Sequence, residues 1–297
     1  MNPLEPLTRL FPASLRTLLA PPAPEQVRRL AGLLGIEPAE LAAVRMGPRY
    51  HYRPFTLAKR DGRERRILAP SPALKQLQRR LLDQYLYELP VHPFATAFRP
   101  DFSIVENARL HAYATVVATV DLRDFFESTS ASRVRRFFAR QGWQGEALAA
   151  LMRLCVYRNG LPQGAPTSPC LSNLVNVSLD GRLHQLAAQS QGYYTRYGDD
   201  LTFSWRTGTM PGGFQAAVED HVRAAGYEIQ PCKGWRVSSI RERPRVTGLV
   251  LAGNGRLRVP WALRWHIWRL RWRSWWSGEE GAAARLAGYA GFLRMVR

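Results

Sequence analysis

Three aspartates are the residues in this sequence whose types and spacing suit metal-dependent chemistry. Asp199 and Asp200 are adjacent, directly after Gly198, with strand-forming residues at 193–195 and an alternating apolar and polar run at 201–205. This pattern predicts a β-hairpin whose tip carries both carboxylates. Adjacent carboxylates repel each other and lose hydration, so a fold brings them together where cations gather. An aspartate pair after glycine is also common in solvated turns, and this pair alone leaves both interpretations open.

The third aspartate, Asp121, follows a short β-branched run at 115–120 that is typical of a buried strand. It would then lie at the carboxyl end of a core strand, where open sheets place their ligands. We expect a short loop at 122–127, and an N-cap among residues 128–130 for a helix containing Val134. A strand ending in Asp121 beside a hairpin tipped by two carboxylates can hold two divalent ions about 3.5–4 Å apart. Two such ions support nucleotidyl transfer without a side-chain nucleophile, because they activate a hydroxyl and neutralise charge on the phosphates.

Three segments that contain these aspartates or lie between them resemble motifs A, B and C of reverse transcriptases, in the same order and with similar spacing. They are Asp-Leu-Arg-Asp-Phe-Phe at 121–126, Leu-Pro-Gln-Gly-Ala-Pro-Thr-Ser-Pro at 161–169 and Tyr-Gly-Asp-Asp at 197–200. The resemblance reaches from about Tyr52 to the C-terminus. It implies an α+β fold of the right-hand polymerase type, with fingers, a palm whose antiparallel sheet carries the catalytic aspartates, and a short helical thumb. The expected divisions are an N-terminal helical extension at 1–48, fingers at 49–112, a palm at 113–250 with a fingers insertion around 131–165, and a thumb or RNA-binding C-terminal region at 251–297.

The resemblance also implies the residues of the active site. Asp121, Asp199 and Asp200 match the catalytic metal ligands, and the implied cofactors are two Mg²⁺ ions, with Mn²⁺ as a substitute. The residues expected to bind the incoming nucleotide are Lys59, Arg65, Phe126, Gln163, Gly164 and Lys233.

Two of these nucleotide-binding groups come from turns. Lys59 and Arg65 flank a basic hairpin, turning at residues 61–62, that resembles the fingers hairpin holding the triphosphate. A solvated basic hairpin is the alternative. Gln163 and Gly164 are expected beside the nascent base pair and the sugar, and the alternative for Gln163 is a turn residue. A long helix with a leucine-rich core face should follow them, from about residue 170 to 186.

The other two nucleotide-binding residues are an aromatic ring and a lysine. The family places a ring that excludes the 2′-hydroxyl five residues after the first catalytic aspartate, which is Phe126 here. In extended backbone its neighbour Phe125 would enter the core, and the alternative is that both rings do. Lys233 is a candidate for protonating pyrophosphate, although the family's Asn-x-x-Lys-Thr pattern is altered by Gln230 and Gly234.

Two short segments resemble elements that distinguish retron reverse transcriptases from other bacterial ones. Asn-Ala-Arg-Leu-His at 107–111 matches their Asn-Ala-x-x-His element, and Val-Thr-Gly at 246–248 matches a second one, although Gly198 stands where retrons more usually have alanine. The resemblance implies RNA-binding roles for Asn107, His111 and Thr247. It also implies synthesis of a short single-stranded DNA from a structured noncoding RNA, in anti-phage defence.

The composition indicates a polyanionic partner. Lys and Arg number 42 against 23 Asp and Glu, a net charge of +19 over 297 residues, and the cations are dispersed rather than gathered in a tail. This favours a basic channel for nucleic acid. The three cysteines have no metal-binding spacing and are expected to be reduced core thiols. No apolar run suits a membrane span and the first residues do not look like a signal peptide, so we expect a cytoplasmic bacterial protein without a membrane partner.

The C-terminal region predicts a helix with two apolar faces, entered at Pro260. On a helical wheel Leu263, Ile267 and Leu270 lie opposite the tryptophan face, which consists of Trp261, Trp265, Trp268, Trp272, Trp275 and Trp276. We expect the tryptophan face to be buried, since tryptophan is usually largely buried, with stacking on unpaired bases as the alternative. In either case Arg264 and Arg271 are expected to contact RNA.

Three functions compete. The leading one is a retron reverse transcriptase, whose partners would be its structured RNA, the DNA product, deoxynucleotides and an effector protein encoded nearby. The second is another bacterial reverse transcriptase, of intron, diversity-generating or abortive-infection type. The third is a catalytically silent RNA-binding scaffold, against which the three intact aspartates argue. An adjacent inverted-repeat RNA gene would favour the first.

Overall fold

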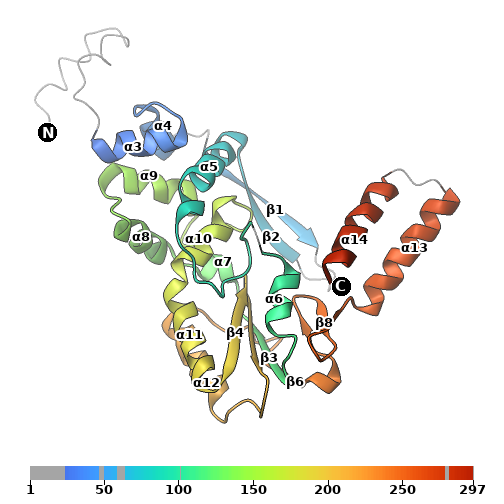
Figure 1. Ribbon diagram of the computed structural model, residues 1–297. Coiled ribbons are helices and arrows are strands. Elements are labelled where there is room, and N and C mark those ends of the chain that lie inside the picture. Colours follow the sequence, from blue (N-terminus) through green and yellow to red (C-terminus); the bar gives the residue numbers. More distant parts are fainter. Residues whose placement is uncertain (1–23, 47–49, 59–63, 101, 278–280, 297) are drawn as a thin grey trace, which may run out of the picture.

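The protein combines helices with antiparallel sheets, as the α+β prediction requires (Figure 1). The computed structural model describes residues 24–46, 50–58, 64–100, 102–277 and 281–296. The strands in this part of the chain are β1 (Tyr52–Ala58), β2 (Glu64–Pro70), β3 (Val116–Asp121), β4 (Gly192–Tyr197), β5 (Asp200–Trp205), β6 (Arg236–Ser239), β7 (Arg245–Val246), β8 (Leu249–Leu251) and β9 (Leu257–Arg258). The helices are α3 (Glu25–Leu34), α4 (Glu40–Met46), α5 (Pro72–Gln84), α6 (Ile104–Leu110), α7 (Phe125–Ser128), α8 (Ala131–Arg140), α9 (Gly145–Cys155), α10 (Thr167–Val175), α11 (Val177–Gln189), α12 (Phe214–Ala224), α13 (Trp261–Ser277) and α14 (Ala282–Val296).

The central sheet has the strand order β4-β5-β3-β6, and every neighbouring pair is antiparallel. It confirms both the buried strand that ends at Asp121 and the hairpin that turns at Gly198 and Asp199. Because β3 pairs with β5, Asp121 is the direct cross-strand partner of Asp200. The sheet register therefore brings together carboxylates that are far apart in the sequence.

The two faces of the central sheet differ in chemistry, since successive side chains point to opposite faces. One face packs against α11 and α12, and its core includes Val120, Leu201, Phe203, Leu183 and Val218. The other face carries Asp121, Asp200, Thr119 and Thr202, and over β3, β5 and β6 it borders a cleft of about 350 Å³. The aspartates thus stand on the polar side of a sheet whose apolar side is covered by helices.

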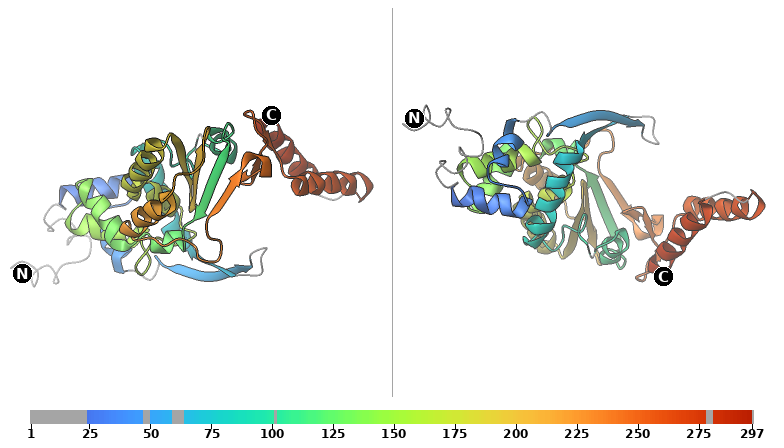
Figure 2. Two further views of the ribbon diagram at one scale, coloured as in Figure 1. Left: turned by 90° about the horizontal axis from the view of Figure 1, so that it is seen from below. Right: turned by 90° about the horizontal axis from the view of Figure 1, so that it is seen from above.

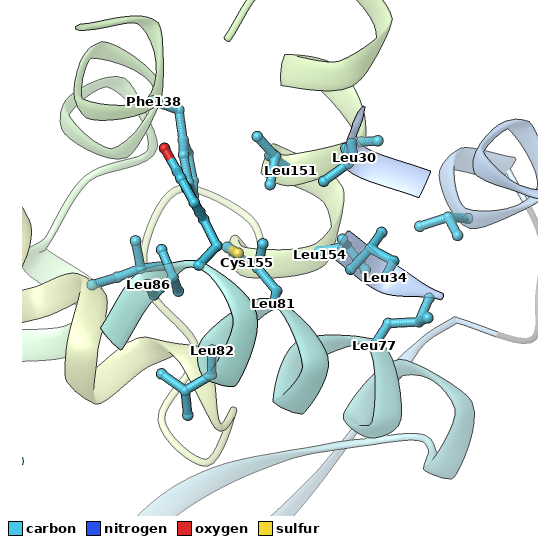
Figure 3. Packing of buried hydrophobic residues seen from close by; sticks show 14 of the residues in the cluster. Leu30, Leu34, Leu77, Leu81, Leu82, Leu86, Phe138, Leu151, Leu154 and Cys155 are labelled. Atoms are coloured by element: carbon cyan, nitrogen blue, oxygen red, sulfur yellow. The ribbon is translucent and has the colours of Figure 1, made fainter. Parts of the chain in front are cut away.

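A separate helical core lies beyond the hairpin β1–β2, where α3, α5 and α9 meet (Figure 3). Leu30 and Leu34 of α3 pack with Leu77 and Leu81 of α5 and with Leu154 of α9, and all of them are buried. Helix α3 lies in the region expected to form a helical extension. Helix α5 ends at Gln84, and a short 3₁₀ turn at Leu86–Glu88 follows it. Residues 1–23 of the expected N-terminal extension lie outside the described residues.

Three local predictions need correction. The long helix expected after residue 169 is two helices, α10 and α11, separated at Asn176, whose side chain donates hydrogen bonds to Ser172 O and Tyr227 Oη at 2.8 Å each. Residues 125–128 form the short helix α7 instead of a loop. Cys232 is exposed, whereas Cys155 and Cys170 are buried as expected.

The C-terminal helices α13 and α14 project from the body of the protein beside β8 (Figures 1 and 2). The end of α14 is anchored, because Val296 is buried with Val105 and Leu249. Ile267 and Leu270 of α13 are 8% and 7% exposed, while Trp261 and Trp275 are 74% and 79% exposed. The expectation that the tryptophan face is buried is therefore wrong: the aliphatic face packs inward instead. No helix in the described ranges is long and apolar enough to cross a membrane.

Candidate active site

The three predicted catalytic aspartates lie at one end of the central sheet. Asp121 ends β3 and is 4% exposed, Asp200 begins β5 opposite it, and Asp199 lies in the turn before β5. The backbone holds the arrangement, because Leu122 N–H donates to Asp199 O at 2.9 Å and Gln230 N–H donates to Asp121 O at 2.8 Å. The positions of all three carboxylates are thus fixed by the register of the sheet.

Two cations contact the most buried of these carboxylates. Lys233 Nζ lies 2.5 Å from Asp121 Oδ1, and Arg236 Nη2 lies 3.4 Å from Asp121 Oδ2. Burial alone would raise the pKa of Asp121, but hydrogen bonds from Asp200 and Lys233 and the two positive charges hold it below its ordinary value. Asp121 is therefore the ionised member of the group.

The other two carboxyls resist ionisation. Burial and the neighbouring Asp121 raise the pKa of Asp200 to about 8, so its carboxyl holds a proton and donates to Asp121. Loss of hydration also raises the pKa of Asp199, a rise that Asp121 strengthens and that Lys233 and Arg65 oppose. Burial and like charge thus disfavour the simultaneous ionisation of all three carboxyls.

The three carboxyls fit a divalent cation in chemistry, because hard oxygen donors and unrelieved like-charge repulsion are what Mg²⁺ or Mn²⁺ would satisfy. Among the described residues, no three His, Cys, Asp or Glu side chains are arranged around a common point as metal ligands. The ammonium of Lys233 occupies one Asp121 oxygen at hydrogen-bond distance. Lys233 would therefore compete with a bound cation for this oxygen.

A buried ion pair beneath the aspartate turn was not predicted from the sequence. Arg196 donates from Nε and Nη2 to the two oxygens of Asp180 at 2.8 and 2.7 Å, and both side chains are fully buried. Arg196 Nη1 donates to Gly198 O at 3.2 Å and to Asn173 Oδ1 at 3.1 Å, and Asp180 also accepts from Tyr194 Oη at 2.8 Å. Helices α10 and α11 thus hold the glycine carbonyl of the turn that carries Asp199. The only sequence signal was an arginine at a position that faces the apolar side of β4.

The loop before α10 is docked on strand β2. Leu68 N–H donates to Gln163 O at 2.8 Å, and a Cβ at Gly164 would come within 2.9 Å of both Ile67 Cγ2 and Leu68 O. Gly164 also has φ +121°, so a side chain there would be strained as well as obstructed. The contact brings Gln163 beside the strand that carries Arg65, whose charge acts on Asp199. Lys59 lies outside the described residues.

The two phenylalanines separate as expected, but for a different reason. Phe125 is buried on Tyr227, with ring centroids 5.5 Å apart, whereas Phe126 is half-buried beside Phe98, at 6.0 Å. Both belong to helix α7 rather than to extended backbone, and α7 begins after Asp124 in a left-handed conformation with φ 42°. Phe126 is therefore the more exposed of the two rings.

The three residues expected to contact RNA through the retron-type segments instead make internal contacts. His111 is 1% exposed and bridges Ser204 Oγ at 2.7 Å and Thr195 Oγ1 at 2.8 Å. Asn107 is fully buried and accepts a hydrogen bond from Thr96 Oγ1 at 2.7 Å. Thr247 Oγ1 donates to Ile104 O at 2.8 Å. Direct RNA contact by Asn107 and His111 is a wrong prediction, because neither side chain reaches the surface.

The predicted RNA-binding arginines of α13 are exposed, and one of them borders a large basic cleft. Arg264 and Arg271 both face solvent. Arg264 lines a cleft of about 830 Å³ together with Arg109, Arg256 and Arg258. No acidic side chain is among the residues that line this cleft. The cleft could take a polyanion, and it lies apart from the three aspartates.

Comparisons with known proteins agree with this geometry. Residues 57–241 match the family model described as reverse transcriptase (RNA-dependent DNA polymerase). The chain is 38% identical over 235 residues to the retron Mx162 reverse transcriptase of Myxococcus xanthus, and the aligned region covers 69% of this chain and 48% of that protein. It is 36% identical over 205 residues to the retron Ec86 reverse transcriptase of Escherichia coli, which covers 68% of this chain and 64% of that one. It thus spans about half to two thirds of the length of these relatives. The chain belongs to the reverse transcriptase family and is of the retron type within it.

Proposed function

We propose that the protein is an RNA-directed DNA polymerase that transfers nucleotides with two divalent ions, Mg²⁺ by preference and Mn²⁺ as a substitute. The observation that carries the proposal is the cross-strand pairing of Asp121 with Asp200 next to Asp199, at the open polar end of the sheet. When bound, the ions would activate the primer hydroxyl and neutralise charge on the phosphates. Asp121, Asp199 and Asp200 would hold them.

The other residues expected at the active site have proposed roles in binding the incoming nucleotide. Arg65 of β2, whose charge acts on Asp199, would bind the triphosphate through its guanidinium fork, together with Lys59. Gln163 and Gly164 would support the base pair and sugar, and Phe126 would exclude a 2′-hydroxyl. Lys233 stands within reach of the departing pyrophosphate once it leaves Asp121, and it can donate a proton there.

The proposed division into lobes follows the sheets and helices. We assign the fingers to 49–112 with an insertion around 131–165, the palm to 113–250, the thumb to 251–297, and a helical extension to 1–48. The open polar face of the palm sheet would lie against the template and primer. The large basic cleft between α6 and α13 extends the positively charged surface toward the thumb.

The retron assignment defines the substrate further. The relatives named above are retron reverse transcriptases, and the net charge of +19 suits a nucleic acid held along much of the chain. We infer that the template is a structured noncoding RNA and the product a short single-stranded DNA, made in the bacterial cytoplasm for anti-phage defence with an effector protein encoded nearby. Co-purified RNA that maps to an inverted repeat beside the gene would support this over an intron, diversity-generating or abortive-infection enzyme.

The decisive experiment compares the wild type with Asp199→Ala. The variant should lose several orders of magnitude in DNA synthesis on a primed RNA template and keep nearly all its RNA affinity, because other positive charges bind the RNA. Asp220→Ala, at an exposed position of α12 on the opposite face of the sheet, is a matched loss of one carboxylate and should leave synthesis unchanged. Full-length synthesis by Asp199→Ala would refute the metal assignment, and an inactive wild type that still binds RNA would favour the scaffold.

A further inference from the structure

Helix α13 carries a row of exposed indoles that the fold does not use. We name it the tryptophan stripe, and its members are Trp261, Trp265, Trp268, Trp272, Trp275 and Trp276. They are between 49% and 79% exposed, and they account for six of the nine tryptophans of the chain. At 1.5 Å per residue the stripe is about 22 Å long, and on a helical wheel it is about 100° wide.

The stripe is independent of the packing that holds α13 in place. Ile267 and Leu270 lie on the opposite side of α13 and are buried, and His266 contacts Tyr289 of α14 with ring centroids 6.0 Å apart. Within the stripe the rings stack on each other. Trp265 and Trp268 have centroids 4.7 Å apart at an interplanar angle of 19°, and Trp272 and Trp276 are 6.1 Å apart at 13°. Each stacked pair covers one face of each of its rings, but the indoles as a whole remain exposed, so loss of one indole would open no core.

Positive charge borders the stripe on both sides. On the helical wheel Arg264 and Arg271 lie along one edge and Arg269 and Arg273 along the other, and no acidic residue occurs in α13. Arg264 also lines the large basic cleft with Arg109, Arg256 and Arg258, so the charged edge continues toward the body of the protein. An occupant should therefore combine flat rings with closely spaced negative charge.

We propose that the tryptophan stripe binds unpaired nucleotides of RNA, with bases stacked on the indoles and phosphates bound by the flanking arginines. Stacking on aromatic side chains with arginine on the backbone is how proteins hold single-stranded nucleic acid without reading its sequence. A base-paired stem has no free base faces to offer, so the occupant is a loop or single-stranded segment. That this nucleic acid is RNA rests on the function proposed above.

Two other occupants suit the stripe less well. Tryptophan and arginine also gather on helices that lie at a membrane surface, but insertion there uses apolar area and needs no parallel stacking of the rings. A groove on a partner protein would bury the indoles, yet four arginines along the edges would need matching acids on that partner. The alternation of flat rings with cations fits a polynucleotide most directly.

The test uses the full-length protein and a fluorescein-labelled, unstructured 12-nucleotide oligo(A) RNA. Trp268→Ala should weaken binding about 5- to 100-fold, the range for one stacked base, while the melting temperature stays within about 2 °C of wild type. Trp268→Phe should bind within about threefold of wild type because it keeps an aromatic face, whereas Trp268→Leu should bind as weakly as alanine. Tyr87→Ala, which removes an exposed ring far from α13 in the chain, is the matched control and should change nothing.

Salt dependence separates stacking from charge. Trp268→Ala should lower affinity at every salt concentration with an unchanged slope, whereas Arg264→Ala with Arg271→Ala should flatten the slope by about one unit for each lost phosphate contact. A base-paired RNA of equal length should bind more weakly and be insensitive to Trp268→Ala, and a single-stranded DNA 12-mer tests preference for RNA. The proposal would be overturned if the oligo(A) RNA bound with equal affinity to Trp268→Phe, Trp268→Leu and Trp268→Ala.

The remaining outcomes also decide it. If Trp268→Ala abolishes binding to phosphatidylcholine–phosphatidylglycerol vesicles but leaves RNA binding unchanged, the proposal is refuted and the stripe is a membrane-binding surface. DNA synthesis is measured in parallel at saturating primed template. If the wild type synthesises DNA normally and the substitutions in the tryptophan stripe leave RNA binding unchanged, this inference is refuted and the proposed polymerase function is not. RNA binding that depends on the stripe, in a wild type that makes no DNA, supports the inference and refutes the polymerase.

Discussion

The buried Arg196–Asp180 pair provides a sharp test of how the fold positions the catalytic turn. Among the hydrogen bonds of the described residues, only those of Arg196 connect the Gly198 carbonyl to side chains of α10 and α11. Replacement by methionine removes this donor while keeping a side chain of similar length. The turn should then shift relative to Asp121, and catalysis should fall because a displacement of about 1 Å in an active site costs up to about 100-fold.

The magnitudes distinguish positioning from plain loss of stability. Arg196→Met leaves the Asp180 carboxylate buried with only Tyr194 as a donor, which should destabilise the fold by about 3–5 kcal/mol. Replacing the whole unit, with Asp180→Leu, Arg196→Met and Tyr194→Phe together, leaves no buried charge or unpaired hydroxyl. Apolar replacement of a buried ion pair is often neutral or stabilising by about 1–4 kcal/mol, which offsets the loss of the donor to Gly198 O and Asn173 Oδ1, so the triple variant should be about as stable as wild type.

The assay combines urea unfolding with steady-state DNA synthesis on a primed homopolymer template. The triple variant should unfold near the wild-type midpoint yet show kcat reduced about 10- to 100-fold with a smaller change in KM. Arg196→Lys keeps the charge but loses the fork that reaches Gly198, so it should also lose kcat. A stable triple variant with kcat within twofold of wild type would refute the positioning role and leave Arg196 as a purely structural residue.

Three further predictions follow from single residues. Phe126→Val should raise ribonucleotide incorporation in competition assays, whereas Phe125→Ala should instead destabilise the fold by about 3–5 kcal/mol; the reverse pattern would move the gate to Phe125. Burial lowers the pKa of His111 from 6.5 to about 3, so the unfolded chain binds a proton that the folded protein does not, and stability falls as pH drops through this window. Between pH 7 and about 4.5, the free energy of unfolding of His111→Gln, measured in urea, should therefore fall by about 2–3 kcal/mol less than that of wild type. An equal fall in both proteins would contradict the conclusion that His111 is buried in its neutral form. Lys233→Met removes the cation bound to Asp121, so synthesis should reach half-maximum at several-fold lower Mg²⁺ while kcat falls; an unchanged Mg²⁺ requirement would show that Lys233 does not compete there.

Local patterns in the sequence predicted the elements that carry the aspartates. The β-branched run before Asp121 and the alternating strands around Gly198 determine a strand and a hairpin through short-range preferences, and both occur where expected. Their mutual pairing, which sets Asp121 opposite Asp200, was not predicted, since the family resemblance implied only that one antiparallel sheet carries the aspartates. Long-range pairing of strands depends on the whole sheet, so no short window of sequence contains it.

The errors have a common physical origin, which is that burial is a property of the assembled fold. The tryptophans of α13 were expected inside because of their size, yet the smaller Ile267 and Leu270 are buried and the indoles are exposed. Arg196 was overlooked, because a charged residue in a strand usually faces solvent and only the position of Asp180 on α11 makes its burial tolerable. Neither the burial of the aliphatic face of α13 nor the position of Asp180 beside Arg196 could be predicted from residue type and spacing.

The two segments that distinguish retron reverse transcriptases act on the central sheet through their own internal contacts. His111 joins Thr195 of β4 to Ser204 of β5, so it clamps the hairpin whose tip carries Asp199. Thr247 in turn holds the start of the helix that ends at His111, through Ile104 O. A residue pattern that marks a type of enzyme can thus specify the packing behind a site without touching the ligand. On this view the surface arginines of the basic cleft beside α6, rather than Asn107 or His111, would contact an RNA. An RNA bound there would influence the position of the hairpin that carries Asp199 only indirectly, through the packing of α6 and His111.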